Sequence, residues 1–128
     1  MRRKLPHCPL CGLRVASIKG HMERIHGGYK YNGVKMRSSW EVRVAQYLDG
    51  QGMRWVYEER KFMLDDKRSY TPDFFVYPDD TPEFIIEVKG WWRPGSRKKF
   101  AEFRAMYPEV NIEVWNRVEF FRRGIPTI

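Results

Sequence analysis

The strongest constraint on the fold comes from two short motifs, Pro72-Asp73 and Glu87-Val88-Lys89, which are separated by 13 residues. The second motif follows the apolar run Phe84-Ile85-Ile86, which is typical of a buried strand. Alternate residues of a strand point to opposite faces, so Glu87 and Lys89 project together while Val88 points into the core. If the two motifs lie on paired strands, Asp73 comes beside Glu87. The sequence therefore predicts a sheet that carries two carboxylates and an ammonium group on one face.

Helices and strands are expected on both sides of these motifs. Ser38 or Ser39 is a good helix N-cap, and apolar residues follow it at helical spacing. Further along, apolar and aromatic runs alternate with turn-forming residues. The expected order is a helix over residues 40–48, strands over 54–64, 69–77 and 84–89, a helix over 96–106 and a strand over 111–115. The helix before the last strand allows a parallel crossover, so we predict an α/β fold.

The two motifs supply the ligands and charge that phosphodiester hydrolysis needs. Two carboxylates and a backbone carbonyl suit a hard divalent cation, so we expect Asp73, Glu87 and the main-chain carbonyl of Val88 to bind Mg²⁺ or Mn²⁺. Such an ion polarises the scissile phosphate, and Lys89 can orient the attacking water or offset charge on the phosphoryl oxygens. A Glu-x-Lys pair also occurs on ordinary salt-bridged strands. The functional interpretation therefore depends on Pro72-Asp73 and on the strand context.

The runs Tyr70-Thr71-Pro72-Asp73-Phe74 and Ile86-Glu87-Val88-Lys89-Gly90 resemble the PD-(D/E)XK nuclease superfamily. The resemblance covers about residues 36–116. It implies a restriction-endonuclease-like αβββαβ core with Asp73, Glu87 and Lys89 as catalytic residues. Many members, including Holliday junction resolvases, add a glutamate from the first helix, and Glu41 matches that position. Glu41 is therefore implied as a fourth catalytic residue and metal ligand, although a glutamate there also complements the helix dipole.

A second set of metal-ligand residues lies near the N-terminus. Cys8 and Cys11 form a Cys-x2-Cys loop, and His21 and His26 are close enough on one expected helix to converge on a tetrahedral ion. The four residues resemble a two-cysteine, two-histidine zinc finger, although the span between Cys11 and His21 is shorter than the usual one of about twelve residues. We predict a structural Zn²⁺ in a finger at residues 1–28, a glycine-rich linker at 27–33, and a nuclease domain at 29–128.

The chain has a net charge of +8, with 24 basic and 16 acidic residues. This charge favours a polyanionic partner such as DNA, although anionic lipid, ribosomal RNA or simple solubility also fit. Aromatic residues after the third strand can stack on unpaired bases. The residues expected to bind DNA are Arg2, Arg3, Lys4, Lys30, Lys35, Arg37, Trp91, Trp92, Arg93, Arg97, Lys98 and Lys99.

Together these features predict a metal-dependent endodeoxyribonuclease that is encoded by a phage or mobile element and acts in the host cell cytoplasm. The small size, Glu41 and the lack of a large recognition domain favour a structure-selective Holliday junction resolvase that works as a homodimer. Two alternatives stay open: a sequence-specific homing or restriction-type endonuclease, and a catalytically silent DNA-binding module. The longest apolar runs are only a few residues long, so no membrane span is expected.

Overall fold

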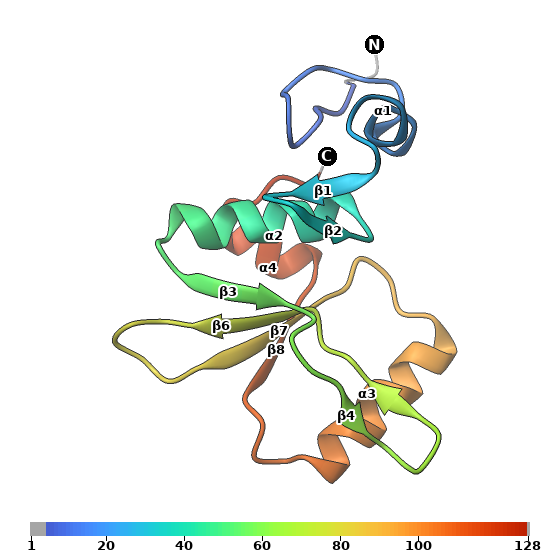
Figure 1. Cartoon of the computed structure of the whole chain (residues 1–128), viewed down its shortest axis with the longest axis vertical. Helices are drawn as coiled ribbons and strands as arrows, with labels where there is room; N and C mark the ends of the chain where they lie inside the picture. Colours follow the sequence, from blue (N-terminus) through green and yellow to red (C-terminus); the bar gives the residue numbers. More distant parts are fainter. Residues whose placement is uncertain (1–4, 128) are drawn as a thin grey trace.

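The protein has a mixed α/β fold in the computed structural model, which describes residues 5–127 (Figure 1). The expected α/β class is therefore confirmed. In chain order the elements are α1 (Ile18–Ile25), β1 (Tyr29–Tyr31), β2 (Val34–Met36), α2 (Ser39–Gly50), β3 (Arg54–Tyr57), β4 (Phe62–Met63), β5 (Ser69–Tyr70), β6 (Phe74–Tyr77), β7 (Phe84–Val88), α3 (Pro94–Met106), β8 (Ile112–Trp115) and α4 (Arg117–Arg123).

The central sheet has the strand order β3-β6-β7-β8. Strands β3 and β6 are antiparallel, as are β6 and β7, whereas β7 and β8 are parallel and are connected through α3. In the register of β6 and β7, Phe74 lies opposite Ile86. One residue further along, the same register places Asp73 across from Glu87. Strand pairing therefore brings the two sequence motifs together.

Two of the expected strands are interrupted in the structure. The expected strand at residues 54–64 divides into β3 and β4, and Glu58 between them has a left-handed φ of 48°. The expected strand at residues 69–77 divides into β5 and β6 around Pro72, which has no amide hydrogen to donate to a ladder. Strands β4 and β5 pair with each other in a separate ladder. The interruptions of the two strands lie side by side, and a hydrogen bond links them: the Glu58 N–H donates to the Asp73 carbonyl at 2.8 Å.

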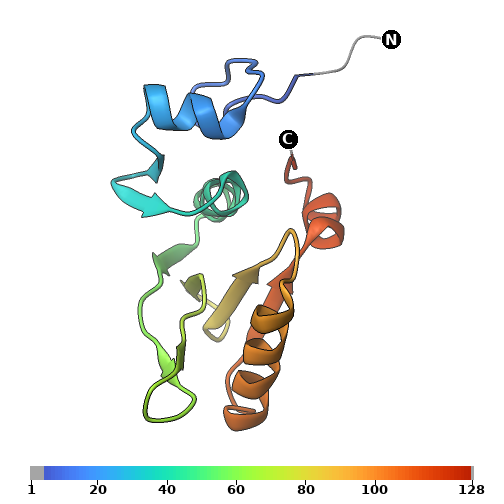
Figure 2. The ribbon, with the colours of Figure 1, turned by 90° about the vertical axis from the view of Figure 1, so that its right-hand side faces the viewer.

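Helices cover both faces of the central sheet (Figure 2). On one face, α2 and α4 pack in the main core, which contains Val42, Phe74, Ile86, Trp115 and Phe120. On the other face, α3 packs through Phe100 and Phe103 in a second core that contains Tyr70 and Leu64. The sheet is therefore the middle layer of three, and the acidic motif residues lie at the end of its buried strands.

The N-terminal segment packs directly against α2. Cys8 and Met22 belong to the same core as the α2 residues, and Arg43 Nη2 of α2 donates to the His7 carbonyl at 3.1 Å. The expected linker at residues 27–33 is wrong, because most of it belongs to a β1–β2 hairpin. Asn32 and Gly33 both have positive φ, at 50° and 78°, which is the two-residue turn that Asn-Gly favours.

Helix α4 follows β8 and was not expected from the sequence. Asn116 caps its N-terminus by accepting from the Glu119 N–H, and Gly124 ends it in the left-handed region at a φ of 70°. Among the helices within residues 5–127, none is long and apolar enough to cross a membrane.

Candidate active site and metal centres

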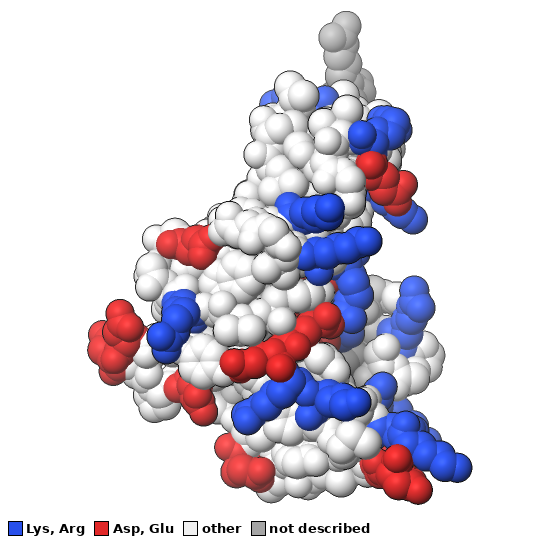
Figure 3. Space-filling view, viewed as in Figure 1, with Lys and Arg blue, Asp and Glu red and all other residues white. Residues whose placement is uncertain are grey.

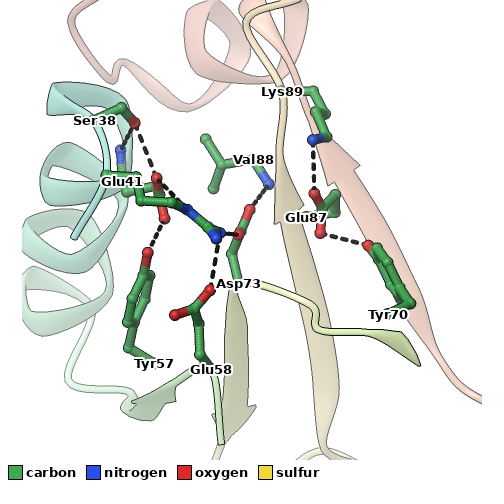
Figure 4. Close-up of polar contacts among 10 residues, drawn as sticks. Ser38, Glu41, Tyr57, Glu58, Tyr70, Asp73, Glu87, Val88 and Lys89 are labelled. Atoms are coloured by element: carbon green, nitrogen blue, oxygen red, sulfur yellow. Dashed lines mark hydrogen bonds and ion pairs between the residues drawn. The ribbon is translucent and has the colours of Figure 1, made fainter. Parts of the chain in front are cut away.

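Three acidic side chains from separate parts of the chain meet in one pocket (Figure 4). Glu41 is in the first turn of α2, Asp73 directly precedes β6, and Glu87 is in β7. Their exposed fractions are only 5%, 3% and 3%. The pocket has a volume of about 390 Å³ and is also lined by Lys89. The structure thus brings together all four residues expected to be catalytic, while their roles stay predictions.

Asp73 lies between two hydrogen-bond donors. Its Oδ2 accepts from the Val88 N–H at 2.7 Å, and its Oδ1 accepts from Arg37 Nη2 at 2.9 Å. Burial, together with the charges of Glu87 and Glu41, nevertheless raises the pKa of Asp73 to about 8. A bound cation strongly stabilises the ionised form of a carboxylate whose surroundings otherwise disfavour that form.

Glu87 is fixed from two sides. The Tyr70 hydroxyl donates to its Oε1 at 2.5 Å, and Lys89 Nζ lies 3.1 Å from its Oε2. Burial raises the pKa of Glu87, whereas the Tyr70 hydrogen bond and the Lys89 charge oppose that rise. The ammonium of Lys89 also lies 5.2 Å from the centre of the Trp92 ring. Lys89 is therefore held beside the carboxylates with its charge facing the pocket.

Glu41 combines a helix-capping role with its place in the pocket. Ser38 is the N-cap of α2 and accepts from the Glu41 N–H at 3.2 Å, while its hydroxyl donates to Glu41 Oε1. The Tyr57 hydroxyl of β3 donates to the other carboxylate oxygen. Burial, followed by this hydrogen bond, raises the pKa of Tyr57, so the hydroxyl stays a donor. The capping interpretation of Glu41 and its place in the pocket are thus compatible.

The sequence predicts that Arg37 contacts DNA phosphates, but in the structure its guanidinium contacts carboxylates. Its Nη2 lies 2.9 Å from both Asp73 and Glu58, and its Nε lies 3.9 Å from Glu41. The guanidinium therefore balances acidic charge on one side of the pocket. The side chain remains 64% exposed, so contact with DNA stays a prediction.

Sequence reasoning missed two residues of this site, Tyr57 and Tyr70, and treated Glu58 as a strand residue that is solvated or salt-bridged. Tyr57 and Tyr70 hold carboxylates, and Glu58 holds Arg37. Tyr70 belongs to the run that resembles the nuclease superfamily, which was a usable signal. The Glu58 contact depends on its left-handed φ at the end of β3, and no local pattern indicated that conformation.

The second candidate centre is formed by Cys8, Cys11, His21 and His26. Their ligand atoms all lie within 4.8 Å of one another. The Cys8 sulfur is 3.4 Å from Nε2 of His26, and the Cys11 sulfur is 3.2 Å from Nε2 of His21. Tetrahedral Zn²⁺ with ordinary bond lengths would separate sulfur and nitrogen ligands by about 3.6 Å. The donor set and its spacing therefore fit one tetrahedral ion.

The remaining residues expected to bind DNA are spread over several elements. Lys30 and Lys35 are exposed on the β1–β2 hairpin. Trp91 is 71% exposed, whereas Trp92 packs on Phe100 with ring centres 5.2 Å apart. Arg93 is the N-cap residue of α3. The first turns of α3 contain Arg97, Lys98 and Lys99, and Lys99 lines the acidic pocket. Arg2, Arg3 and Lys4 lie outside the described residues.

Comparison with known proteins gives a match that spans most of the chain. The family model described as phage endonuclease I matches residues 23–120. Endonuclease I of Escherichia phage T7 is 32% identical over 94 residues, which cover 68% of this chain and 60% of the relative. Endodeoxyribonuclease 1 of Enterobacteria phage T3 is 32% identical over 85 residues, which cover 64% of this chain and 53% of the relative.

The two candidate centres differ in how far the family match covers their residues. The chain spans between half and two thirds of the length of these curated relatives. The family match includes every acidic residue of the pocket and Lys89, but it begins after Cys8, Cys11 and His21. The acidic pocket therefore lies in the part of the chain that matches the family model. On the extent of the family match, the chain belongs to the phage endonuclease I family.

Proposed function

We propose that the protein is a metal-dependent endonuclease of the PD-(D/E)XK type that hydrolyses phosphodiester bonds in DNA. The observation that carries this proposal is the cluster of three buried carboxylates with Lys89 in a single pocket. The family match supports it, because the relatives named above are endonucleases. The whole activity is a proposal for this chain, since it spans only part of those relatives.

The pocket fits a hard divalent cation such as Mg²⁺ or Mn²⁺. Its donors are carboxylate oxygens, which such ions prefer, and burial opposes their negative charge when no cation is near. Asp73 and Glu87 would hold the ion with the main-chain carbonyl of Val88, and Glu41 would add a further carboxylate. When bound, the ion supplies polarisation of the scissile phosphate and acidification of water.

The protein's own groups have distinct parts in this proposal. Lys89 offsets negative charge on the phosphoryl oxygens or orients the attacking water. Tyr70 fixes the rotamer of Glu87, and Tyr57 does the same for Glu41, because each hydroxyl donates to one carboxylate oxygen. Preorganised groups of this kind are effective because they need no rearrangement during the reaction.

The first test neutralises the carboxylates one at a time. We expect Asp73→Asn and Glu87→Gln to lower DNA cleavage by at least about 100-fold, the order lost when one preorganised electrostatic group is removed. Binding of DNA should survive, because each change preserves the shape of the side chain. Glu83→Gln is the matched control, since Glu83 is an exposed acid just before β7. Near-normal cleavage by either pocket variant would contradict the active-site assignment.

The substrate that we propose is branched DNA, and the first candidate is a four-way junction. A matched assay compares this junction with linear duplexes of the same sequences, and then with junctions of unrelated sequence. Cleavage of every junction, with little cleavage of linear duplex, is the expected result. Cleavage of one linear sequence would instead favour a homing or restriction-type enzyme. DNA binding without any cleavage would favour a catalytically silent module.

We also propose that the Cys₂His₂ centre binds a structural Zn²⁺. Four protein ligands leave no open position for water, which is the arrangement of structural zinc sites.

We further propose that the protein is a homodimer, since resolving a junction requires two cuts. We also propose that it is encoded by a phage or mobile element and acts in the host cell cytoplasm. Sedimentation of the purified protein with and without junction DNA tests the dimer.

A further inference from the structure

A second hollow lies directly beside the acidic pocket. It has a volume of about 380 Å³ and lies between the loop after β7 and the start of α4. We call it the flanking hollow; it is lined by Lys89, Gly90, Trp91, Trp92, Arg97, Asn116, Arg117 and Val118. Lys89 and Trp92 line the acidic pocket as well. The two hollows are therefore neighbours that meet at the proposed catalytic lysine.

The flanking hollow differs in charge from the acidic pocket. Its lining includes Lys89, Arg97 and Arg117 but no acidic residue, whereas three carboxylates line the pocket beside it. The guanidinium of Arg117 lies 6.0 Å from the centre of the Trp40 ring, so an aromatic contact helps to set its position. Positive groups with no acid among them suit phosphate oxygens, which accept charge-assisted hydrogen bonds from arginine.

Trp91 is the more exposed of the two tryptophans that line this hollow. It is 71% exposed, although the adjacent Trp92 packs on Phe100. Within residues 5–127 the Trp91 ring contacts no other aromatic ring and makes no cation–π contact. A flat aromatic ring beside arginine side chains is the combination that proteins use to stack and hold the bases of single strands.

We propose that the flanking hollow binds the DNA segment next to the scissile phosphate, with phosphates on Arg97 and Arg117 and one unpaired base stacked on Trp91. This inference rests on the proposed nuclease function and deepens it. A base within a duplex is already stacked on both faces, so Trp91 can stack only on a base that has left its neighbours. The hollow thus selects DNA that is unpaired or unstacked close to the cut, as at a branch point.

The test measures stacking separately from cleavage. The full chain carrying Glu87→Gln, which blocks cutting, is titrated with a four-way junction that has the fluorescent base 2-aminopurine at positions beside the branch. In this background we expect one such position to stay quenched in the complex, because the base leaves its neighbours in the strand but stacks on the Trp91 ring. Adding Trp91→Ala should remove the quenching and weaken binding on the order of 10-fold, whereas Trp91→Phe should keep part of both effects.

Phe121→Ala is the matched control, because Phe121 is 86% exposed on α4 but does not line the hollow. It should leave quenching and affinity unchanged. Equal behaviour of Trp91→Ala and Phe121→Ala would overturn the proposal. Failure of the nuclease function would look different: the chain with Glu87 intact would not cut the junction, even though quenching still depended on Trp91.

Discussion

Burial is energetically unfavourable for the ionised carboxylate of Asp73, and the same residue is a proposed metal ligand. It is a buried acid between two other carboxylates, and its pKa is raised to about 8 by burial and by Glu87 and Glu41. The Val88 N–H and Arg37 offset only part of this effect. Perturbed acids of this kind are concentrated at functional sites. The same perturbation makes the stability of the folded protein depend on pH.

We predict that the protein without Mg²⁺ loses stability as the pH rises from about 4 to about 8. In this window the unfolded chain has released the Asp73 proton, because its carboxyl then has an ordinary pKa near 3.8, whereas the folded chain retains the proton. The unfolded state therefore binds fewer protons, and the free energy of unfolding falls with pH. Asp73→Asn removes this titration, so its stability relative to the parent should increase towards pH 8. Urea denaturation at several pH values measures the difference.

Asp65→Asn is the control for this pH effect. Asp65 is an exposed acid, and its hydrogen bond with Arg68, followed by main-chain hydrogen bonds, lowers its pKa to about 2. It is therefore ionised in both states above pH 5, so its removal should shift stability without changing the slope between pH 5 and 8. A slope in Asp73→Asn equal to that of the parent would show that Asp73 does not cause the effect.

Individual site residues could be predicted from the sequence where they belong to a recognisable motif. Asp73, Glu87 and Lys89 share a short pattern, and the alternation of a strand fixes their common face. Arg37 was expected only to bind DNA, because charge composition does not show which carboxylates a guanidinium will meet. Tyr57 is opposite Phe74 in the β3–β6 pair, and its contact with Glu41 depends on how the sheet packs against α2. Such contacts between elements leave no periodic signal.

At the scale of elements, α2 is buried on more sides than its sequence pattern predicts. The sequence predicts one apolar face with Trp40, Val44, Tyr47 and Leu48, but Val42 and Arg43 are buried as well. The reason is that α2 is covered twice, by the sheet and α4 on one side and by the N-terminal segment on the other. The Asn32-Gly33 hairpin was predictable from its turn residues. The division of the strands around Glu58 was not, because non-glycine residues seldom adopt positive φ.

The Cys₂His₂ centre supports α2 from its outer side. Arg43 and Gln46 of α2 donate to the main-chain carbonyls of His7 and Pro9, which flank Cys8. Cys8 itself is buried in the main core together with Met22. Because α2 also carries Glu41, loss of the metal should disturb the acidic pocket as well as the N-terminal segment.

We predict that the purified protein contains about one zinc per chain, as four ligands make one tetrahedral site, and that His26→Ala abolishes this content. The variant should melt at a lower temperature and cut DNA more slowly, because the support behind α2 is lost. His7→Ala is the control, since His7 is an exposed histidine of the same segment outside the cluster. It should retain its zinc and its melting temperature. Elemental analysis that finds full zinc in His26→Ala would contradict the site.

At the scale of the whole molecule, basic side chains are unevenly distributed. In Figure 3 the blue side chains follow the right-hand edge of the view from the N-terminal segment towards α3, whereas much of the red lies on the left and below. Basic residues also line the two hollows, with Arg37, Lys89 and Lys99 at the acidic pocket and Lys89, Arg97 and Arg117 at the flanking hollow. The sequence predicted the total charge but not this arrangement, because it depends on how α3 and the hairpin are placed by the fold.

The start of α3 is the most informative part of this basic surface. Arg97, Lys98 and Lys99 follow an N-cap, Arg93, that has no side-chain capping hydrogen bond, and the first turn has no acidic residue. Positive charge at a helix N-terminus opposes the helix dipole, so these residues lower the stability of α3. A ligand with negative charge would remove that conflict. DNA phosphates beside the acidic pocket fit this requirement, since Lys99 lines the pocket and Arg97 lines the flanking hollow.

We predict that changing Arg97, Lys98 and Lys99 to Gln weakens DNA binding about equally for all sequences and flattens its dependence on salt. Each phosphate contact contributes about 0.9 to the slope of log affinity against log salt, so loss of three contacts should reduce the slope by roughly 2 to 3. The control replaces Arg54, Lys67 and Arg122 with Gln, which removes the same charge from residues that line neither hollow. Binding titrations of a four-way junction at several salt concentrations compare the two variants with the parent. If both variants flattened the slope equally, net charge alone would explain binding, and α3 would not be the DNA contact surface.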